Sequence, residues 1–361
     1  MMRRISLEQI QPGMVAAKTV YGSRGQVLLN SGTDVKPHYA RYLRALGIYH
    51  LYVYDSRLEG VEVDDVVTEK TRMEARNLVR QVMNKAESGR PDNKSILLED
   101  KSMINTVEQI VDELLSNRDV VVNLLDVRAL EEYTFAHSVN TCLLSTLAAI
   151  KMQYTTKQVK NIALGSLLHD LGNTAIPSQI LKKPGSLTLD EFETVKKHPV
   201  YGFELFKRSN LFTASAGAVI YQHHERKAGQ GYPEGRTGDN INPLARIAGL
   251  ANVYDALTSD RPYRRAHLPH QAIEMLQGMG DTHFDLDVLS TFLSFIAAYP
   301  VGTHVLLNNK ESGLVVKNTP GFPNRPVVRI LYEGESLAPH PEPYEVDLTE
   351  VLDLVIEKVI E

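Results

Sequence analysis

Short alternating runs of apolar residues open the chain. Three of them have the period of two that is typical of half-buried strands: residues 13–21, 25–29 and 48–54. Between the last two runs, residues 36–47 have the spacing of a helix that ends at Gly47. The charged stretch 55–65 follows and is interpreted as a linker. The pattern therefore predicts a small α/β domain over residues 1–60.

Helical spacing dominates from about Val67 to Ile296. Apolar residues recur every three or four positions in residues 71–89 and 104–117, which predicts two long amphipathic helices joined by a loop at 90–95. Further along, Thr188 precedes Glu191 by three residues, which is the pattern of a capping box at a helix start. This part of the chain is predicted to be a helical bundle, and its two amphipathic stretches are compatible with a homodimer contact.

Alternation returns from about Pro300. The strand-like runs are separated by turn residues and lie at positions 302–309, 312–318 and 326–334. They predict a small β-rich module closed by a short C-terminal helix. The whole chain is thus predicted to be mainly α, in four segments: a small N-terminal α/β domain (1–60), a helical linker and dimerisation region (61–125), a helical domain (126–297) and a C-terminal β-rich module (298–361).

Composition limits the classes of protein that this chain can belong to. Its 361 residues are 43% apolar and 23% charged, with a formal net charge of −5, which is an ordinary composition for a folded soluble protein. The mild negative charge gives no support for binding to DNA or RNA. No apolar run approaches the ~20 residues that a membrane span needs, and the N-terminus turns polar too soon for a signal peptide. The single cysteine, Cys142, lies in an apolar run, so we expect a buried thiol in a cytoplasmic protein.

Histidines are concentrated in the helical segment. Eight of the twelve in the chain lie there, and five of these fall between residues 137 and 224: His137, His169, His198, His223 and His224. Any one of them alone is best explained as an ordinary core or surface residue. Together, and with Asp170 directly after His169, they favour a metal site, because imidazole and carboxylate groups are ligands for Fe, Mn, Ni or Zn. Spacing alone does not choose among these metals.

Several motifs in this segment carry a resemblance to a known family. They are "HD" (169–170), "IPSQILKKPGSLT" (176–188), "KKHPVYG" (196–202), "HHERKAGQGYPEG" (223–235), "PLARI" (243–247) and "YDALTSDRPYRRA" (254–266). In this order the segment from about Tyr133 to Ala266 resembles the HD-GYP family of HD metal-dependent phosphohydrolases. The resemblance implies an HD-type helical bundle over residues 126–297, and hydrolysis of the bacterial second messenger cyclic di-GMP to pGpG, with GMP as a further product.

The resemblance also implies a set of site residues and a cofactor. The family's metal-ligand positions are occupied here by His137, His169, Asp170, His198, His223, His224 and Asn252. They imply two divalent metal ions, iron or manganese, with Asp170 bridging them and acting in catalysis. Arg261 and Arg264 fall where the family binds the substrate phosphates. The "GYP" residues Gly231, Tyr232 and Pro233 are expected to form a lip of the substrate pocket, with Tyr232 offering a hydroxyl or a stacking face.

The chain departs from the family pattern at four positions. Asn173 replaces a lysine that is expected to contact a phosphate or the attacking water, and it keeps a hydrogen-bonding amide at this catalytic position. Asn252 replaces the last ligating aspartate, which removes one negative charge. Ala228 replaces the aspartate before "GYP", and Tyr133 stands where some members have a glutamate that binds a third metal.

Asp255 is a candidate substitute for the missing aspartate. It lies three residues after Asn252, about 60° around the same helix. A substitute role is compatible with this angle, but we favour a helix-stabilising or capping role for its carboxylate.

Two functions compete on these residues. The first is a cyclic di-GMP phosphodiesterase acting in bacterial signal transduction. The alternative is a catalytically impaired HD-GYP domain that serves as a cyclic di-GMP receptor or protein-interaction module, which the changes at Asn173, Ala228 and Asn252 motivate. A third interpretation is an HD phosphohydrolase that acts on another phosphate ester. A diguanylate cyclase or an adaptor protein is compatible as a partner.

Overall fold

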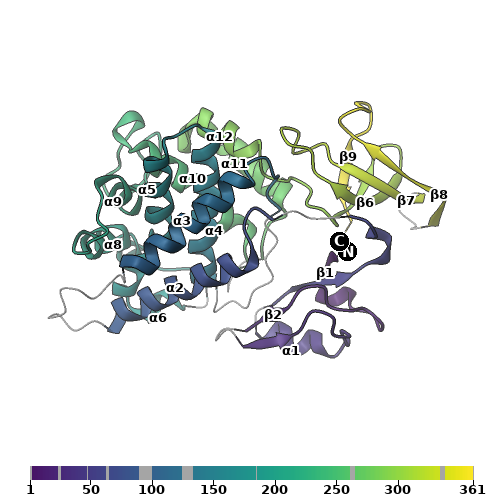
Figure 1. Ribbon diagram of the computed structural model, residues 1–361, viewed down its shortest axis with the longest axis horizontal. Helices are drawn as coiled ribbons and strands as arrows, with labels where there is room; N and C mark the ends of the chain where they lie inside the picture. The colour runs from purple at the N-terminus through teal and green to yellow at the C-terminus, as the bar shows by residue number, and fades with distance from the viewer. Residues whose placement is uncertain are drawn as a thin grey trace. The chain divides into compact units, whose positions relative to one another are not determined.

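The computed structural model divides the chain into two compact units. Unit 1 comprises Met1–Asp65, Asp119–Tyr133 and Ser294–Glu361, and unit 2 comprises Val66–Arg118 and Thr134–Leu293. The residues that it describes are 2–22, 26–46, 48–61, 65–88, 100–123, 133–183, 185–260, 265–333 and 338–360. Unit 2 contains helices α2 to α12, and unit 1 contains all the strands (Figure 1). This confirms the predicted fold class: mainly α, with a small N-terminal α/β part and a C-terminal sheet.

The N-terminal part of unit 1 is built around two short antiparallel strand pairs. Strand β1 (Met2–Ser6) pairs with β4 (His50–Tyr54), and β2 (Val20–Tyr21) pairs with β3 (Val27–Leu29). Helix α1 (Tyr39–Ala45) contributes Leu43 to the core between them. The sequence pattern identified β3, α1 and β4 but not β1, because β1 is made of two arginines and only one large aliphatic residue and becomes a strand only by pairing with β4.

The C-terminal part of unit 1 is a five-stranded antiparallel sheet in the order β8-β7-β6-β5-β9. Its strands are β5 (His304–Leu307), β6 (Glu311–Lys317), β7 (Val327–Glu333), β8 (Ala338–Asp347) and β9 (Ile356–Val359). The predicted C-terminal helix is wrong. Residues 356–359 form β9, because Ile356 and Val359 pair with the open edge of β5, at Leu307 and Val305. This long-range pairing outweighs local helix preference.

The stretch 55–65 is interpreted above as a linker, and its described residues 55–61 pack against the C-terminal sheet within unit 1. Leu58 and Val61 are buried with Val301, Leu314 and Val316. Arg329 on β7 donates to two carbonyl oxygens of the stretch, those of Arg57 and Glu59. The N- and C-terminal parts, which the sequence placed in separate segments, therefore share one unit; the four-segment division itself stays a prediction.

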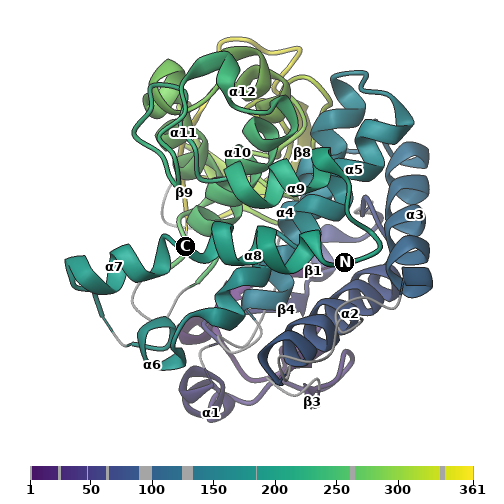
Figure 2. The same ribbon diagram turned by 90° about the vertical axis from the view of Figure 1, so that its left-hand side faces the viewer.

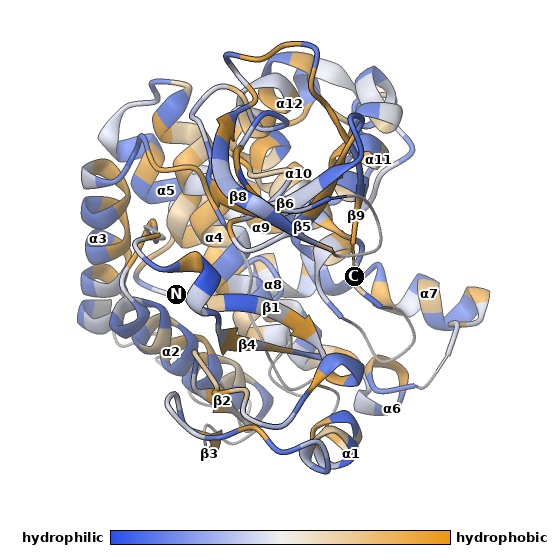
Figure 3. Ribbon diagram, turned by 90° about the vertical axis from the view of Figure 1, so that its right-hand side faces the viewer, coloured by the Kyte–Doolittle hydropathy of each residue, from blue (hydrophilic) through white to orange (hydrophobic). Residues whose placement is uncertain are grey.

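Unit 2 is a helical bundle centred on α4 and α10. Its helices are α2 (Glu69–Ser88), α3 (Asp100–Ser116), α4 (Tyr133–Lys151), α5 (Thr156–Leu167), α6 (Ser178–Leu181), α7 (Leu189–Val195), α8 (His198–Lys207), α9 (Ala214–Gln222), α10 (Pro243–Thr258), α11 (Pro269–His283) and α12 (Leu286–Leu293). Residues 136–149 of α4 are all buried, including the Cys142 thiol, whose pKa burial raises to about 12. Helices α2 and α3 alternate hydrophilic and hydrophobic positions, as amphipathic outer helices do, whereas α4 and α10 are mostly hydrophobic (Figure 3).

Local features set where the helices of unit 2 begin. Thr188 and Glu191 form the predicted capping box of α7: the Glu191 N–H donates to Thr188 Oγ1 at 3.2 Å, and the Thr188 N–H donates to Glu191 Oε2 at 2.7 Å. Asn242 caps α10 in a similar way by accepting the Leu244 N–H. Helices α6 and α7 extend away from the rest of the bundle (Figure 2). Among the described residues, none of the helices combines the length and the apolar character that crossing a bilayer requires.

The packing around Gly172 explains why a glycine is required two residues after Asp170. It lies in the short 3-10 helix η4 (Leu171–Ala175), which packs directly on α8. A Cβ at Gly172 would lie 1.9 Å from the backbone oxygen of His198 and 2.4 Å from the backbone nitrogen of Gly202. Only a residue without a side chain permits this approach, and the approach brings Asp170 and His198 into one site.

Candidate metal centre

The candidate ligands come from separate helices of unit 2. They are His137 on α4, His169 and Asp170 between α5 and η4, His198 at the start of α8, His223 and His224 directly after α9, and Asn252 on α10. His169 and His223 are fully buried, and His137, His198 and Asn252 are at most 6% exposed. Buried imidazoles at this density need partners, since an unpaired polar atom in a protein interior is costly.

Backbone carbonyl groups fix the orientation of three of these rings. The Nδ1 atoms of His169, His198 and His223 each lie 2.8 Å from the carbonyl oxygen three residues earlier, at Ser166, Val195 and Ile220 respectively. A carbonyl oxygen can only accept, so Nδ1 carries the hydrogen in each ring. In the neutral ring Nε2 then has a free lone pair, as in a histidine that ligates a metal.

The rings stay neutral because they are buried. Burial lowers the pKa of His169 to about 4, and it lowers the pKa values of His198, His223 and His224 below their ordinary range. Burial also acts to raise the pKa of Asp170, but the surrounding histidines outweigh it and lower that pKa below its usual range. At neutral pH the site therefore combines uncharged nitrogen donors with an ionised carboxylate.

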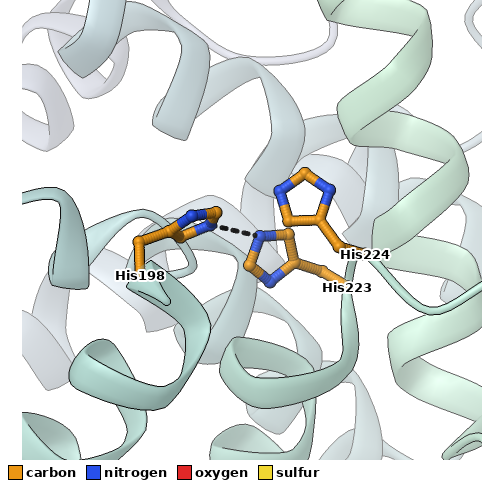
Figure 4. Close-up of side chains that lie close together, drawn as sticks. All are labelled: His198, His223 and His224. Carbon is orange, nitrogen blue, oxygen red and sulfur yellow. Dashed lines mark hydrogen bonds between the residues drawn. The ribbon is translucent and has the colours of Figure 1, made fainter. Parts of the chain in front are cut away.

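The ligand atoms form two groups. In one, His198, His223 and His224 have nitrogen atoms within 4.8 Å of one another, and in the other the same holds for His137, His169 and the Asp170 carboxylate (Figure 4 shows the first group). Asp170 faces both groups. Its Oδ1 lies 3.5 Å from His198 Nε2, and its Oδ2 lies 3.4 Å from His169 Nε2.

The lone pairs in these groups lack hydrogen donors. His198 Nε2 and His223 Nε2 face each other at 3.2 Å although neither carries a hydrogen, and His169 Nε2 is buried without a hydrogen-bond partner among the described residues. Cations satisfy such convergent acceptors, and imidazole with carboxylate is a ligand set for divalent transition metals. The residues present therefore fit a divalent-metal site.

His137 is held between two side chains of α10. Its Nδ1 lies 2.7 Å from Asp255 Oδ2, and its Nε2 lies 3.0 Å from Asn252 Oδ1. Asp255 also accepts a hydrogen bond from Asn140 Nδ2 at 2.6 Å. Asp255 does contact the end of its own helix, where it accepts a hydrogen bond from Ser259 Oγ at 3.3 Å. The expected helix-stabilising or capping role is nevertheless incomplete: the residue is 2% exposed and its carboxylate also contacts α4.

Tyr232 covers one side of the centre. Its ring is stacked on His224 with 4.4 Å between ring centroids and 19° between planes, and burial raises the pKa of its hydroxyl. Phe192 on α7 meets the same tyrosine edge to face at 6.5 Å. A Cβ at Gly231 would lie 2.4 Å from the His224 backbone oxygen, so this glycine allows the "GYP" loop to lie against the histidine pair.

Glu225 holds the "GYP" loop from the other side. It is 5% exposed, and its two carboxylate oxygens accept the N–H groups of Glu234 and Arg236 at 2.9 and 2.8 Å. Sequence reasoning missed this role, although an acidic residue directly after the histidine pair was the available indication. It also missed Asn140 and Phe192, which carry no motif.

The structure describes some of the remaining predicted site residues and not others. Asn173 lies in η4 with a half-buried side chain and, among the described residues, makes only backbone hydrogen bonds, to Asp170 and Ile176. Pro233 follows Tyr232 in the loop through a cis peptide bond. Arg261 and Arg264 lie outside the described residues.

Two family models match the chain. Residues 113–288 match a model described as "HD domain", and residues 304–361 match a model described as "KOW domain associated with HD domain". The first range contains all the candidate ligands, and the second covers β5 to β9.

Relatives with named activities are similar to parts of this chain. A cyclic di-GMP phosphodiesterase of Pseudomonas aeruginosa, PA4108, is 34% identical over 236 residues, which is 65% of this chain and 57% of the relative. The cyclic di-GMP phosphodiesterase response regulator RpfG of Xanthomonas campestris is 40% identical over 140 residues, 38% of this chain and 37% of the relative. A 3′3′-cGAMP-specific phosphodiesterase of Vibrio cholerae is 32% identical over 189 residues, 52% of this chain and 36% of the relative. The chain thus spans between about a third and three fifths of these relatives' lengths.

Proposed function

Because this chain contains an HD domain of the HD-GYP family, we propose that it hydrolyses cyclic di-GMP at a centre of two divalent metal ions. The expected product is pGpG, with GMP as a further product. The observation that carries the proposal is Asp170, whose two oxygens face two separate groups of histidine nitrogens. A single carboxylate in this position can bridge two ions.

The candidate ligands would bind the two ions as two sets. His198, His223 and His224 would hold one ion, and His137 and His169 the other. Asn252 would be a further ligand of the second ion, since its Oδ1 lies beside His137 Nε2. Imidazole and carboxylate ligands suit iron or manganese, which we propose as the native metals. The bound ions would supply an activated water and compensate the charge of the phosphodiester.

The protein's own groups would prepare the site for this chemistry. The carbonyl groups of Ser166, Val195 and Ile220 keep three imidazoles in the tautomer that ligates. Tyr232 shields His224 from water and presents its ring and hydroxyl at the site.

Three further residues are proposed to contact the substrate. Arg261 and Arg264 would bind its phosphates through paired guanidinium donors. Asn173 would offer an amide hydrogen bond to a phosphate oxygen or to the attacking water, without the charge of the family's lysine.

We also propose a setting for this activity. The substrate is a bacterial signalling molecule, so a cytoplasmic location and regulation by a diguanylate cyclase or an adaptor protein fit it. The amphipathic helices α2 and α3 are proposed to support a homodimer.

The test combines metal analysis with product analysis. Protein purified anaerobically is assayed for bound metal, then for turnover of cyclic di-GMP with added Mn²⁺ or Fe²⁺, with 3′3′-cGAMP and mononucleotides as comparison substrates. We expect about two metals per chain and formation of pGpG, and loss of both in Asp170→Asn. The control is Asp285→Asn, since Asp285 pairs with Arg246 and not with a candidate ligand.

Three results would contradict this function. Tight cyclic di-GMP binding without product would identify a receptor. Turnover of mononucleotides alone would identify a different phosphohydrolase. Preferred turnover of 3′3′-cGAMP would replace the proposed substrate.

A further inference from the structure

Four buried polar side chains connect helix α2 to the candidate metal centre. Arg72 Nη1 donates to Asn140 Oδ1 at 3.4 Å, and Asn140 Nδ2 donates to Asp255 Oδ1 at 2.6 Å. His137 Nδ1 lies 2.7 Å from Asp255 Oδ2. All four residues are at most 3% exposed. The connection therefore runs through the interior of unit 2, from α2 through α4 and α10 and back to α4.

Every hydrogen bond in this connection has a defined direction. A guanidinium can only donate, so the Asn140 oxygen must face Arg72 and its NH₂ group must face Asp255. An ionised carboxylate can only accept, so His137 must carry its hydrogen on Nδ1. The lone pair of His137 is then on Nε2, the atom that faces Asn252 Oδ1 at 3.0 Å and Asp170 Oδ2 at 4.0 Å.

His137 differs in this respect from three other histidines of the centre. His169, His198 and His223 are each oriented by the backbone carbonyl three residues earlier in the chain. His137 is oriented by the side chain of another helix, so its tautomer depends on residues that a substitution can change.

We propose, on the basis of the metal site in the proposed function, that Asp255, Asn140 and Arg72 are positioning residues that hold His137 with its Nε2 lone pair toward the metal. Arg72 lies before residue 113, where the match to the HD family model begins. Helix α2 is accordingly part of the metal centre's support. A carboxylate that orients a ligating imidazole also makes it a stronger donor, which partly compensates for the neutral amide of Asn252.

Helix α2 is itself anchored at its start. The Thr68 N–H donates to Glu113 Oε2 on α3 at 2.6 Å, and Gln109 Nε2 donates to Thr71 Oγ1 at 2.6 Å. These contacts lie within one turn of Arg72. They fix the end of α2 from which the guanidinium reaches Asn140.

The decisive measurement is Mn²⁺ binding to metal-free protein by calorimetry, without substrate. For Asp255→Asn we expect affinity for the second ion's site to fall about 10- to 100-fold, the usual effect of losing a group that orients a ligand. For Arg72→Gln we expect a smaller loss, and for the double variant no more loss than Asp255→Asn alone, because Arg72 acts through Asp255. The matched control is Arg246→Gln, which removes an Arg–Asp pair at 3.0 Å whose partners are not candidate ligands.

A second measurement reads the tautomer directly. Nitrogen chemical shifts of His137 in metal-free protein should show hydrogen on Nδ1 in the wild type and a mixture of tautomers in Asp255→Asn. Hydrogen on Nε2 in the wild type would overturn the inference even if the protein bound no metal.

The calorimetric outcomes are equally clear. Wild-type Mn²⁺ affinity in Asp255→Asn, or losses for Arg72→Gln and Asp255→Asn that add fully, would overturn the inference. A wild type that binds Mn²⁺ with the predicted variant effects but does not hydrolyse cyclic di-GMP would contradict the proposed function and leave the positioning role intact.

Discussion

His198 and His223 face each other with their Nε2 atoms 3.2 Å apart, and each donates its Nδ1 hydrogen to a backbone carbonyl of its own segment. Two lone pairs at this distance repel each other unless a cation is shared between them. Rotating either ring away from this contact would break its Nδ1 hydrogen bond to the backbone carbonyl. The centre is therefore preorganised for a metal.

Replacing His198 tests the first histidine group. In His198→Gln we expect bound metal to fall from about two to about one per chain and turnover to fall ~10²- to 10³-fold, because one ligand of a charge-stabilising ion is lost. Elemental analysis and steady-state kinetics measure both. His38→Gln, at an exposed position, is the control. Unchanged metal content would mean that His198 is not a ligand.

Restoring a carboxylate at Asn252 should strengthen the second group. In Asn252→Asp we expect Mn²⁺ to bind at least ~10-fold more tightly, because a charged oxygen replaces a neutral one beside His137 Nε2. Calorimetry on metal-free protein measures the change. An affinity equal to that of the wild type would exclude residue 252 from the ligand set.

Two substitutions distinguish the role of the Tyr232 ring from the role of its hydroxyl. Tyr232→Phe keeps the stack on His224, so metal affinity should stay within about twofold of the wild-type value. Any rise in KM for cyclic di-GMP in this variant would measure the contribution of the hydroxyl to substrate binding. Tyr232→Ala removes a stacked pair worth about 1 kcal/mol, so metal affinity should fall about fivefold. Equal effects of the two variants on metal binding would show that the stack does not support His224.

His304 should make the stability of unit 1 depend on pH. Burial, with help from Arg3 and Arg57, lowers its pKa from an ordinary 6.5 to about 4. The unfolded chain therefore binds a proton between these values that the folded chain does not. The stabilising contribution is complete above pH 6.5 and is lost as pH falls toward 4. At pH 5 this loss should lower the free energy of unfolding by about 1–2 kcal/mol.

Urea unfolding at pH 7.5 and pH 5.0, with EDTA present, measures this effect. In His304→Gln the loss of unfolding free energy on acidification should be smaller than in the wild type by that amount. His38→Gln should behave as the wild type does. An identical pH dependence in His304→Gln would assign the effect to other groups.

The local sequence pattern was sufficient to predict much of the fold of this protein and the motifs of its HD domain. Helical periodicity identified the bundle of unit 2, and Thr188 with Glu191 marked the start of α7, because capping and amphipathicity depend on residues within one or two turns. The motifs around His169, His198 and His223 identified the HD domain, which the family model then matched.

Tertiary structure decided what depends on residues far apart in sequence. Residues 356–359 became β9 because β5 offered an open edge, and Asp255 met His137 and Asn140 because α10 and α4 are neighbours in the bundle. Sequence alone could name His137 as a candidate ligand, but the nitrogen that carries its hydrogen is determined by a carboxylate 118 residues away. Hydrogen-bond direction follows from the partner's chemistry, and only the fold chooses the partner.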